Sequence, residues 1–282
     1  MRLTLKPEVC GFFDAATATW TYVVWADKAC AIIDSVLDYD AAAGRTSTAS
    51  ANKVISFIRG KGLQVEWILE THIHADHLTA AHYLKEKLGG KTGISRHILD
   101  VLKTWQPILR NEADTPMDGS QFDHLFKDDE KFKIGALDAQ MISTPGHTPA
   151  DAAFIIGDAA FVGDAMFLPD VGTGRCDFPG GSAVDSYNST RKLLNLPESY
   201  RMYVGHDYPE GKPRGAQCMA YVSEQKASNV LAAMTAEKEA FVKNRTESDK
   251  GKDVPKLLLP ALQVNLRAGA LPQFIKIPLN AL

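Results

Sequence analysis

The stretch LETHIHADHL, residues 69–78, places His72, His74, Asp76 and His77 within six positions. Side chains alternate along an extended loop, so His72, His74 and Asp76 can project to one side while His77 approaches from another. Buried imidazoles set this close together are costly unless they are paired or bound to a metal. The spacing therefore predicts a metal site rather than a purely structural cluster.

The cluster lies between a predicted strand and a predicted helix. Residues 63–71 form a short apolar run after Gly62, which is typical of a buried strand. Residues 78–90 are rich in helix formers and stop at Gly89 and Gly90, which predicts a helix with a glycine end. We therefore expect the cluster in the loop that joins them.

Three more candidate ligands follow apolar segments elsewhere in the chain. His147, Asp164 and His206 each come directly after a glycine at the end of a predicted strand. Glycine lets the backbone turn tightly and approach a site closely. Each residue alone is more often structural, but together with the first cluster they predict one composite site. The remaining histidines are given no functional role; they are His82, His97 and His124.

The order of predicted elements indicates an α/β sandwich of two sheets with helices outside them. Residues 17–27 and 29–36 predict a hairpin, and residues 47–62 predict a helix. Residues 105–132 are punctuated by Pro, Asp and Gly, which predicts an irregular region with a short strand. Residues 216–245 have a helix-forming composition.

Neither a repeat nor a Pro/Gly/Ser-rich linker interrupts the chain. One domain over residues 1–282 is therefore expected, with a helical C-terminal portion at about 182–250 and a terminal extension.

Composition narrows the class of partner. The 282 residues include 31 Lys plus Arg and 34 Asp plus Glu, for a formal net charge of −3, which argues against nucleic acid or an anionic membrane as partner. Apolar runs stay shorter than the roughly 18 residues of a membrane helix, and the N-terminus lacks the apolar core of a signal peptide. The four cysteines are widely spaced without a CxxC pair, as in free thiols of a reducing compartment. We expect a cytoplasmic protein that acts on a small molecule, and a homodimer is compatible with these features.

Four short motifs carry a resemblance to a known family. THIHADH, PGHT, GDAMF and GHDY, in this order, resemble the ligand motifs of the metallo-β-lactamase fold, an αββα sandwich with two mixed sheets and an active site at one edge. That fold serves several reactions, so it does not name one. Residues 163–183 and 205–215 are similar to the persulfide dioxygenase (sulfur dioxygenase) branch, and residues 257–280 to its bacterial members. The most specific element is GRCDFPGG, residues 174–181.

The resemblance implies oxidation of glutathione persulfide by O2 and water to sulfite and glutathione, as in sulfide detoxification. It implies one Fe(II) per chain, held by His72, His147 and Asp164. Two imidazoles and one carboxylate on one face suit Fe(II) oxygenases because coordination positions stay open. The other motif residues would orient the ligands or serve a second metal; they are His74, Asp76, His77 and His206. Asp34 is a weaker candidate for the same supporting role.

Arg175 and Tyr208 are the best candidates for catalytic and substrate contacts. Glutathione carries two carboxylates, so its site should contain cations and hydrogen-bond donors. Both residues directly follow ligand-bearing segments. Arg175 could instead form a structural ion pair with Asp177 or Asp170. Cys176 stands where family members have Thr and is given no catalytic role, and a further group of polar residues stays unranked; it comprises Arg214, Lys226, Asn229 and Arg245.

The same seven metal-type ligands would also serve a dinuclear hydrolase. His72, His74 and His147 would hold one metal, Asp164 would bridge, and the second metal would take the remaining ligands, which are Asp76, His77 and His206. Glyoxalase II, a glutathione thioesterase, uses such a set with a bridging hydroxide. It is the main alternative, ahead of a lactonase, a β-lactamase or a non-catalytic metal-binding module.

Overall fold

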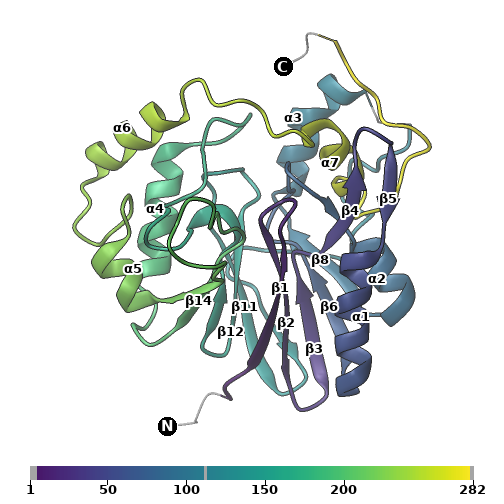
Figure 1. Ribbon diagram of the computed structural model, residues 1–282, viewed down its shortest axis with the longest axis horizontal. Helices are drawn as coiled ribbons and strands as arrows, with labels where there is room; N and C mark the ends of the chain where they lie inside the picture. The colour runs from purple at the N-terminus through teal and green to yellow at the C-terminus, as the bar shows by residue number, and fades with distance from the viewer. Residues whose placement is uncertain (1–4, 111–112, 280–282) are drawn as a thin grey trace.

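Apolar segments of the chain form two large facing β-sheets (Figure 1). The computed structural model describes residues 5–110 and 113–279. One sheet has the strand order β1 (Glu8–Asp14), β2 (Thr19–Ala26), β3 (Ala29–Ile33), β6 (Gln64–Leu69), β8 (Lys91–Ser95) and β9 (His124–Phe126). The other has the order β10 (Lys131–Ile134), β11 (Leu137–Ser143), β12 (Ala152–Ile156), β13 (Ala159–Phe161), β14 (Arg201–Tyr203) and β15 (Met219–Tyr221).

Both large sheets are mixed. Strands β1, β2 and β3 are antiparallel, as the predicted hairpin requires, whereas β3, β6, β8 and β9 run parallel. In the second sheet only the β13–β14 pair is parallel. A small third sheet joins β5 (Arg45–Ser47), β4 (Val36–Asp40) and β7 (Leu78–Thr79).

An aromatic core lies between the large sheets. Tyr22 and Phe126 from the first sheet pack in one cluster with Phe154 and Phe161 from the second, and all four side chains are at most 1% exposed. Burial of one such side chain contributes about 1.5–3 kcal/mol. The Tyr22 hydroxyl also donates to the carbonyl oxygen of Val204 at 2.6 Å. The sheets are therefore held together by apolar burial and by a hydrogen bond that crosses the interface.

Helices cover the outer faces of both sheets (Figure 1). The first sheet is covered by α1 (Ala49–Lys61), α2 (Ala81–Leu88), α3 (Ile98–Leu109) and α7 (Leu258–Asn265). The second is covered by α4 (Ala183–Leu194), α5 (Val222–Ser228) and α6 (Lys238–Asp249). This helix–sheet–sheet–helix order confirms the predicted sandwich. Among the described residues, no helix combines the length and apolar character needed to cross a bilayer.

The prediction of an irregular region over residues 105–132 is wrong at its start. Trp105 and Leu109 belong to the last turns of α3, although Pro107 lies between them. Leu102, Trp105 and Leu109 are buried on one face of this helix. Because this face packs against the core, burial outweighs the cost of a proline near the helix end. The predicted short strand is present as β9, and residues 111 and 112 lie outside the described part of the chain.

The helix-forming stretch 216–245 begins with strand β15, contrary to the prediction, and its helical part is interrupted between α5 and α6. The Asn229 side chain accepts hydrogen bonds from the backbone N–H groups of Leu231 and Ala232 and donates one to the carbonyl oxygen of Gly172. Asparagine competes in this way with helical hydrogen bonding. The interruption therefore depends on a hydrogen bond to a residue far away in the sequence, which local composition could not reveal.

The strand predicted over residues 29–36 ends early, at Ile33. Asp34 has a φ of +51°, in the left-handed region, and Val36 starts β4 in the small third sheet. A non-glycine residue in this conformation is uncommon and costs free energy, so other contacts must hold it. The turn places the Asp34 carboxylate at the edge of the sheets where the histidine motif lies.

Candidate metal centre

The histidine motif occupies the loop after β6, as predicted. His72, His74 and His77 are each 1% exposed. The ring centroids of His72 and His74 are 4.0 Å apart, and those of His74 and His77 are 4.2 Å apart. Such dense packing of buried imidazoles requires partners that satisfy their nitrogens.

The fold brings residues of the second sheet to this loop. Candidate ligand atoms of His72, His147 and Asp164 all lie within 4.8 Å of one another. Ligand atoms of His74, Asp76 and His206 form a second set with the same spacing. His147 lies between β11 and β12, and His206 follows β14, so both come from ends of strands in the second sheet.

Asp164 faces both sets. Its Oδ2 lies 3.6 Å from His147 Nε2, and its Oδ1 lies 3.4 Å from His206 Nε2. The residue sits in a short 3-10 turn, η1 (Gly163–Ala165), which Gly163 enters with a φ of +50°. A Cβ at Gly163 would collide with the Thr71 side chain. Glycine therefore allows the turn to approach the histidine loop closely.

Unpartnered buried atoms show that this donor set fits a metal. Within residues 5–110 and 113–279, the buried side-chain atoms without a hydrogen-bond partner include His72 Nε2, His74 Nδ1, His77 Nε2 and Asp164 Oδ1. A buried polar group without a partner costs about 1–3 kcal/mol. Imidazole nitrogen and carboxylate oxygen are ligands for zinc and iron. A bound cation would satisfy these atoms together.

The electrostatics favour metal-binding forms at His72, His77 and Asp76, whereas neighbouring carboxylates outweigh burial and raise the pKa of His74 and His206. Burial, with His74 nearby, lowers the pKa of His72 well below its usual range, and burial with His74 also lowers the pKa of His77. Burial alone would raise the pKa of Asp76, but His206 and His77 outweigh it and hold that pKa well below its usual range. Neutral imidazole and ionised carboxylate are the forms that bind a metal.

Two carboxylates contact the His74 ring at its Nε2 atom. Asp34 Oδ1 lies 3.0 Å from His74 Nε2, and Glu70 Oε2 lies 3.4 Å from the same nitrogen. Asp34 also accepts hydrogen bonds from the Thr71 backbone N–H and hydroxyl, and Glu70 accepts one from the Thr79 hydroxyl. These contacts fix the ring so that Nδ1 is left without a protein partner. Glu70 was not among the residues predicted from the sequence; the available signal was an acidic residue at the end of an apolar strand, directly before the motif.

Segment 174–181, with the sequence GRCDFPGG, contacts two of the candidate ligands, His147 and Asp164. His147 Nδ1 donates to the carbonyl oxygen of Arg175 at 2.7 Å, which turns Nε2 toward the cluster. The Gly174 N–H donates to the carbonyl oxygen of Asp164 at 3.0 Å, and a Cβ at Gly174 would collide with that oxygen. The segment thus positions His147 and Asp164 through its backbone.

A cavity of about 370 Å³ opens beside the cluster. Its metal-type residues are Asp76, His147, Asp164 and His206, and its other walls include Thr17, Phe167, Arg175, Phe178, Tyr208 and Lys252. Tyr208 is 46% exposed, and its ring stacks on that of His206 with centroids 6.1 Å apart. Both predicted substrate contacts, Arg175 and Tyr208, therefore line the cavity.

The Arg175 guanidinium already has protein partners. Its Nε and Nη2 donate to the Asp177 carboxylate at 2.6 and 2.7 Å, and its Nη1 donates to the carbonyl oxygen of Asp253 at 2.8 Å. It also lies 4.9 Å from the centre of the Phe178 ring. This ion pair with Asp177 is one of the two alternatives that the sequence left open, whereas Asp170 pairs with other cations.

Comparison with models of protein families shows which superfamily the chain belongs to. The model described as the metallo-beta-lactamase superfamily matches residues 15–206, a range that contains all seven candidate ligands. The chain belongs to the metallo-β-lactamase superfamily.

Relatives within this superfamily carry different names. The chain is 49% identical to "Glyoxylase B2" of Dictyostelium discoideum, over 98% of each chain. It is 27% identical to the mitochondrial "Persulfide dioxygenase ETHE1" of Bos taurus, over 91% of this chain and 87% of the relative. Among solved structures, ETHE1 from Myxococcus xanthus superposes with a TM-score of 0.73 at 25% identity, over 93% of this chain and all of the other.

The other candidates contribute to the fold around the centre. Arg214 pairs with the fully buried Asp207, directly after His206, and Arg245 pairs with Asp249. Neither lines the cavity. Burial raises the pKa of the Cys176 thiol to about 12, which leaves almost no thiolate at neutral pH. The unranked Lys226 pairs with Glu198.

Proposed function

We propose that this metallo-β-lactamase-fold chain is a persulfide dioxygenase that oxidises glutathione persulfide with O2 and water to sulfite and glutathione. Its Fe(II), one per chain, would be held by His72, His147 and Asp164. The observation that carries the proposal concerns segment 174–181. This segment bears the most specific resemblance to the dioxygenase branch, and its backbone contacts two of the three proposed ligands.

The chain's own residues would prepare the site for this chemistry. When bound, Fe(II) with two imidazoles and one carboxylate keeps coordination positions open for oxygenase chemistry. The Arg175 carbonyl fixes the His147 ring. Phe167 and Phe178 give the cavity apolar walls, which would disfavour water beside a bound substrate.

Arg175 and Tyr208 are proposed to act at the wall of the same cavity. The Arg175 guanidinium donates hydrogen bonds to Asp177 and to the carbonyl oxygen of Asp253. We therefore propose that Arg175 stabilises the loop that shapes the site. The Tyr208 ring is partly exposed and lies beside His206, and we assign its hydroxyl to contact a bound thiol compound. The similarity to the persulfide dioxygenase of Bos taurus and to ETHE1 from Myxococcus xanthus supports the proposed reaction.

A dinuclear glutathione thioesterase of the glyoxalase II type is the second candidate. The specific observation in its favour is that the Asp164 carboxylate faces both ligand sets, as a bridging ligand would. The unpartnered His74 Nδ1 and His77 Nε2 are also suited to a larger ligand set. The name of the Dictyostelium relative points the same way.

The two reactions differ in what they consume. An oxygen-electrode assay with glutathione persulfide should show O2 uptake matched by sulfite, and S-D-lactoylglutathione should be cleaved negligibly under anaerobic conditions. Rapid anaerobic release of glutathione from the thioester, with no O2 uptake on persulfide, would instead establish the thioesterase.

Metal analysis of the same preparation provides an independent check. One iron per chain in fully active protein is expected, and His147→Ala should remove iron and activity together because two ligands hold Fe(II) poorly. Two equivalents of zinc in a fully active preparation would contradict the mononuclear proposal.

A further inference from the structure

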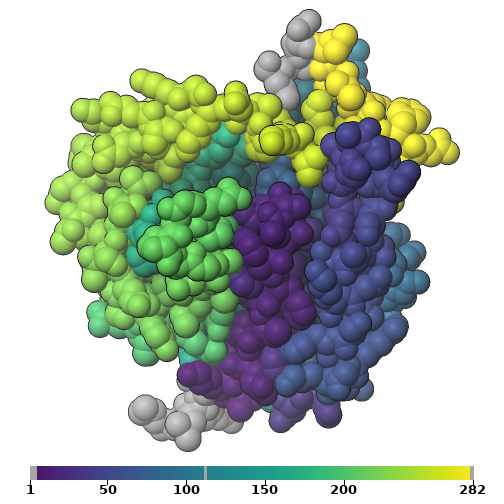
Figure 2. Space-filling view, viewed as in Figure 1, coloured from purple at the N-terminus to yellow at the C-terminus, as the bar shows by residue number. Residues whose placement is uncertain are grey.

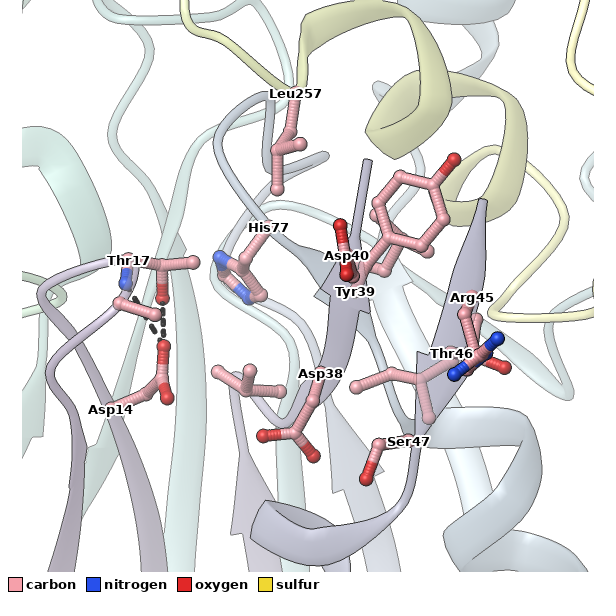
Figure 3. Close-up of a pocket in the computed structure, with 14 residues that line it drawn as sticks. Asp14, Thr17, Asp38, Tyr39, Asp40, Arg45, Thr46, Ser47, His77 and Leu257 are labelled. Carbon is pink, nitrogen blue, oxygen red and sulfur yellow. Dashed lines mark hydrogen bonds between the residues drawn. The ribbon is translucent and has the colours of Figure 1, made fainter. Parts of the chain in front are cut away.

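The C-terminal segment of the chain packs directly against the histidine loop. Leu257, the residue before α7, lies near His77 in a cavity of about 300 Å³, which also borders the β4–β5 hairpin (Figure 3). The sequence alone predicted a terminal extension here, similar over residues 257–280 to bacterial members of the persulfide dioxygenase branch, but no contact with the metal site. Its contacts connect it to residues more than 180 positions earlier in the sequence.

Asn265, the last residue of α7, makes the closest connection. Its Nδ2 donates to the carbonyl oxygens of both His74 and His77, each at 2.8 Å. Its Oδ1 accepts a hydrogen bond from the Thr79 backbone N–H, also at 2.8 Å. The residue is 2% exposed. All three hydrogen bonds are buried, so water cannot readily replace them.

These bonds secure both ends of one short turn. The turn from His74 to His77 carries three candidate ligand side chains, which are those of His74, Asp76 and His77. The backbone carbonyls at its two ends share a single amide group of Asn265. A shift of this turn would move all three side chains at once.

Helix α7 is itself rigidly placed. Leu258 and Leu262 are buried in the cluster that includes α3, while Ala261 and Val264 pack in the cluster that includes α1 and α2. The amide of Asn265 is therefore presented from a fixed support, as a residue that orients metal ligands must be.

We propose that Asn265 is a positioning residue of the metal centre, through which the C-terminal helix holds the ligand loop in its metal-binding geometry. The inference rests on the proposed metal site but not on the reaction carried out there. An aspartate at this position would keep the shape and the acceptor for Thr79 but would place an oxygen against two carbonyls. An alanine would leave the same carbonyls without their donor.

Gln263 offers a matched control on the same helix. It is 4% exposed, its Nε2 donates to the carbonyl oxygens of Leu259 and Lys276, and its Oε1 accepts from the Lys276 N–H. It thus makes three hydrogen bonds, like Asn265, but none of them reaches the histidine loop. Gln263→Ala should destabilise the chain without disturbing the ligands.

The test compares wild type, Asn265→Ala, Asn265→Asp and Gln263→Ala as metal-free proteins that contain residues 1–282. Co(II) is titrated in competition with a chelator, its visible absorption is recorded, and thermal unfolding of each metal-free protein is measured. The Asn265 variants should bind Co(II) roughly 10- to 100-fold more weakly, the usual effect of losing a group that orients metal ligands. Gln263→Ala should keep the wild-type affinity and spectrum.

The possible results distinguish a failure of the positioning role of Asn265 from a failure of the proposed function. Wild-type Co(II) affinity in both Asn265 variants, or an equal loss of affinity in Gln263→Ala, would overturn the positioning role. Should one Asn265 variant fail to fold, the other carries the comparison. Failure of the wild-type protein to bind Co(II) would instead remove the metal site on which the proposed function depends.

Discussion

Asp151 is a buried carboxyl near the metal centre that does not belong to the ligand set. Its side chain accepts hydrogen bonds from the Thr148 backbone N–H at 2.9 Å and from the Thr148 hydroxyl at 2.5 Å. Burial is the largest influence and raises its pKa from an ordinary 3.8 to about 6, despite the opposing effects of His147 and Thr148. The folded protein therefore binds this proton more tightly than the unfolded chain does.

A pH-dependent stability difference follows. Ionisation of Asp151 disfavours the folded state above pH 6, and this penalty disappears as the pH falls toward 4. Metal-free wild type should therefore gain up to about 3 kcal/mol of unfolding free energy relative to Asp151→Asn between pH 7 and pH 4. Urea unfolding of both proteins at several pH values measures it. A constant difference across this range would contradict the raised pKa.

Single residues were predictable where their chemistry is local. The candidate ligands stand in a compact motif or directly after glycines that end strands, and the fold brings His72, His147 and Asp164 together. Asn265 was not predictable, since its partners lie 188 and 191 positions away. Glu70 was missed for a related reason, because its role depends on how the loop folds back onto the end of β6.

At the level of elements, strands and helices with strong local patterns were predicted well. The β2–β3 hairpin, α1, β6 and α2 follow from apolar runs and glycine stops. The predictions of elements were wrong where contacts between residues distant in the sequence determine the local structure. Burial overrides Pro107 in α3, and the Asn229 contact with Gly172 separates α5 from α6.

The η1 turn offers a direct test of how an element positions a ligand. Gly163→Ala would force a Cβ into the Thr71 side chain at a φ of +50°. We expect a loss of about 1–3 kcal/mol in unfolding free energy and a lower metal content, because Asp164 is displaced. Urea unfolding and elemental analysis measure the two effects.

Gly60 in α1 provides the comparison. A Cβ at this position would meet no heavy atom within 4 Å, so Gly60→Ala should raise the unfolding free energy by about 0.5–1 kcal/mol through its better helix propensity. Equal behaviour of the two alanine variants would show that the close approach of η1 to Thr71 is unimportant.

At the scale of the whole molecule, the metal centre joins the two sheets. The histidine loop extends from β6 of the first sheet, whereas His147, Asp164 and His206 extend from strands of the second. In the space-filling view of Figure 2, the purple N-terminal part of the chain lies beside a green later part on one face of the molecule. The aromatic core already couples the sheets. A metal at their edge would add a cross-link that exists only in the folded state.

Metal binding should therefore stabilise the molecule as one cooperative unit. At a free metal concentration 1,000 times the dissociation constant, the gain is about 4 kcal/mol, which corresponds to a rise in Tm on the order of 10 °C for a chain of this size. Calorimetry of metal-free and Co(II)-loaded protein should show a single transition that moves upward as a whole. His147→Ala should lose most of this gain, since it removes a ligand of the second sheet but leaves the core unchanged. Two separate transitions, of which the metal moves only one, would mean that the ligands bind within one half of the molecule and do not connect the sheets.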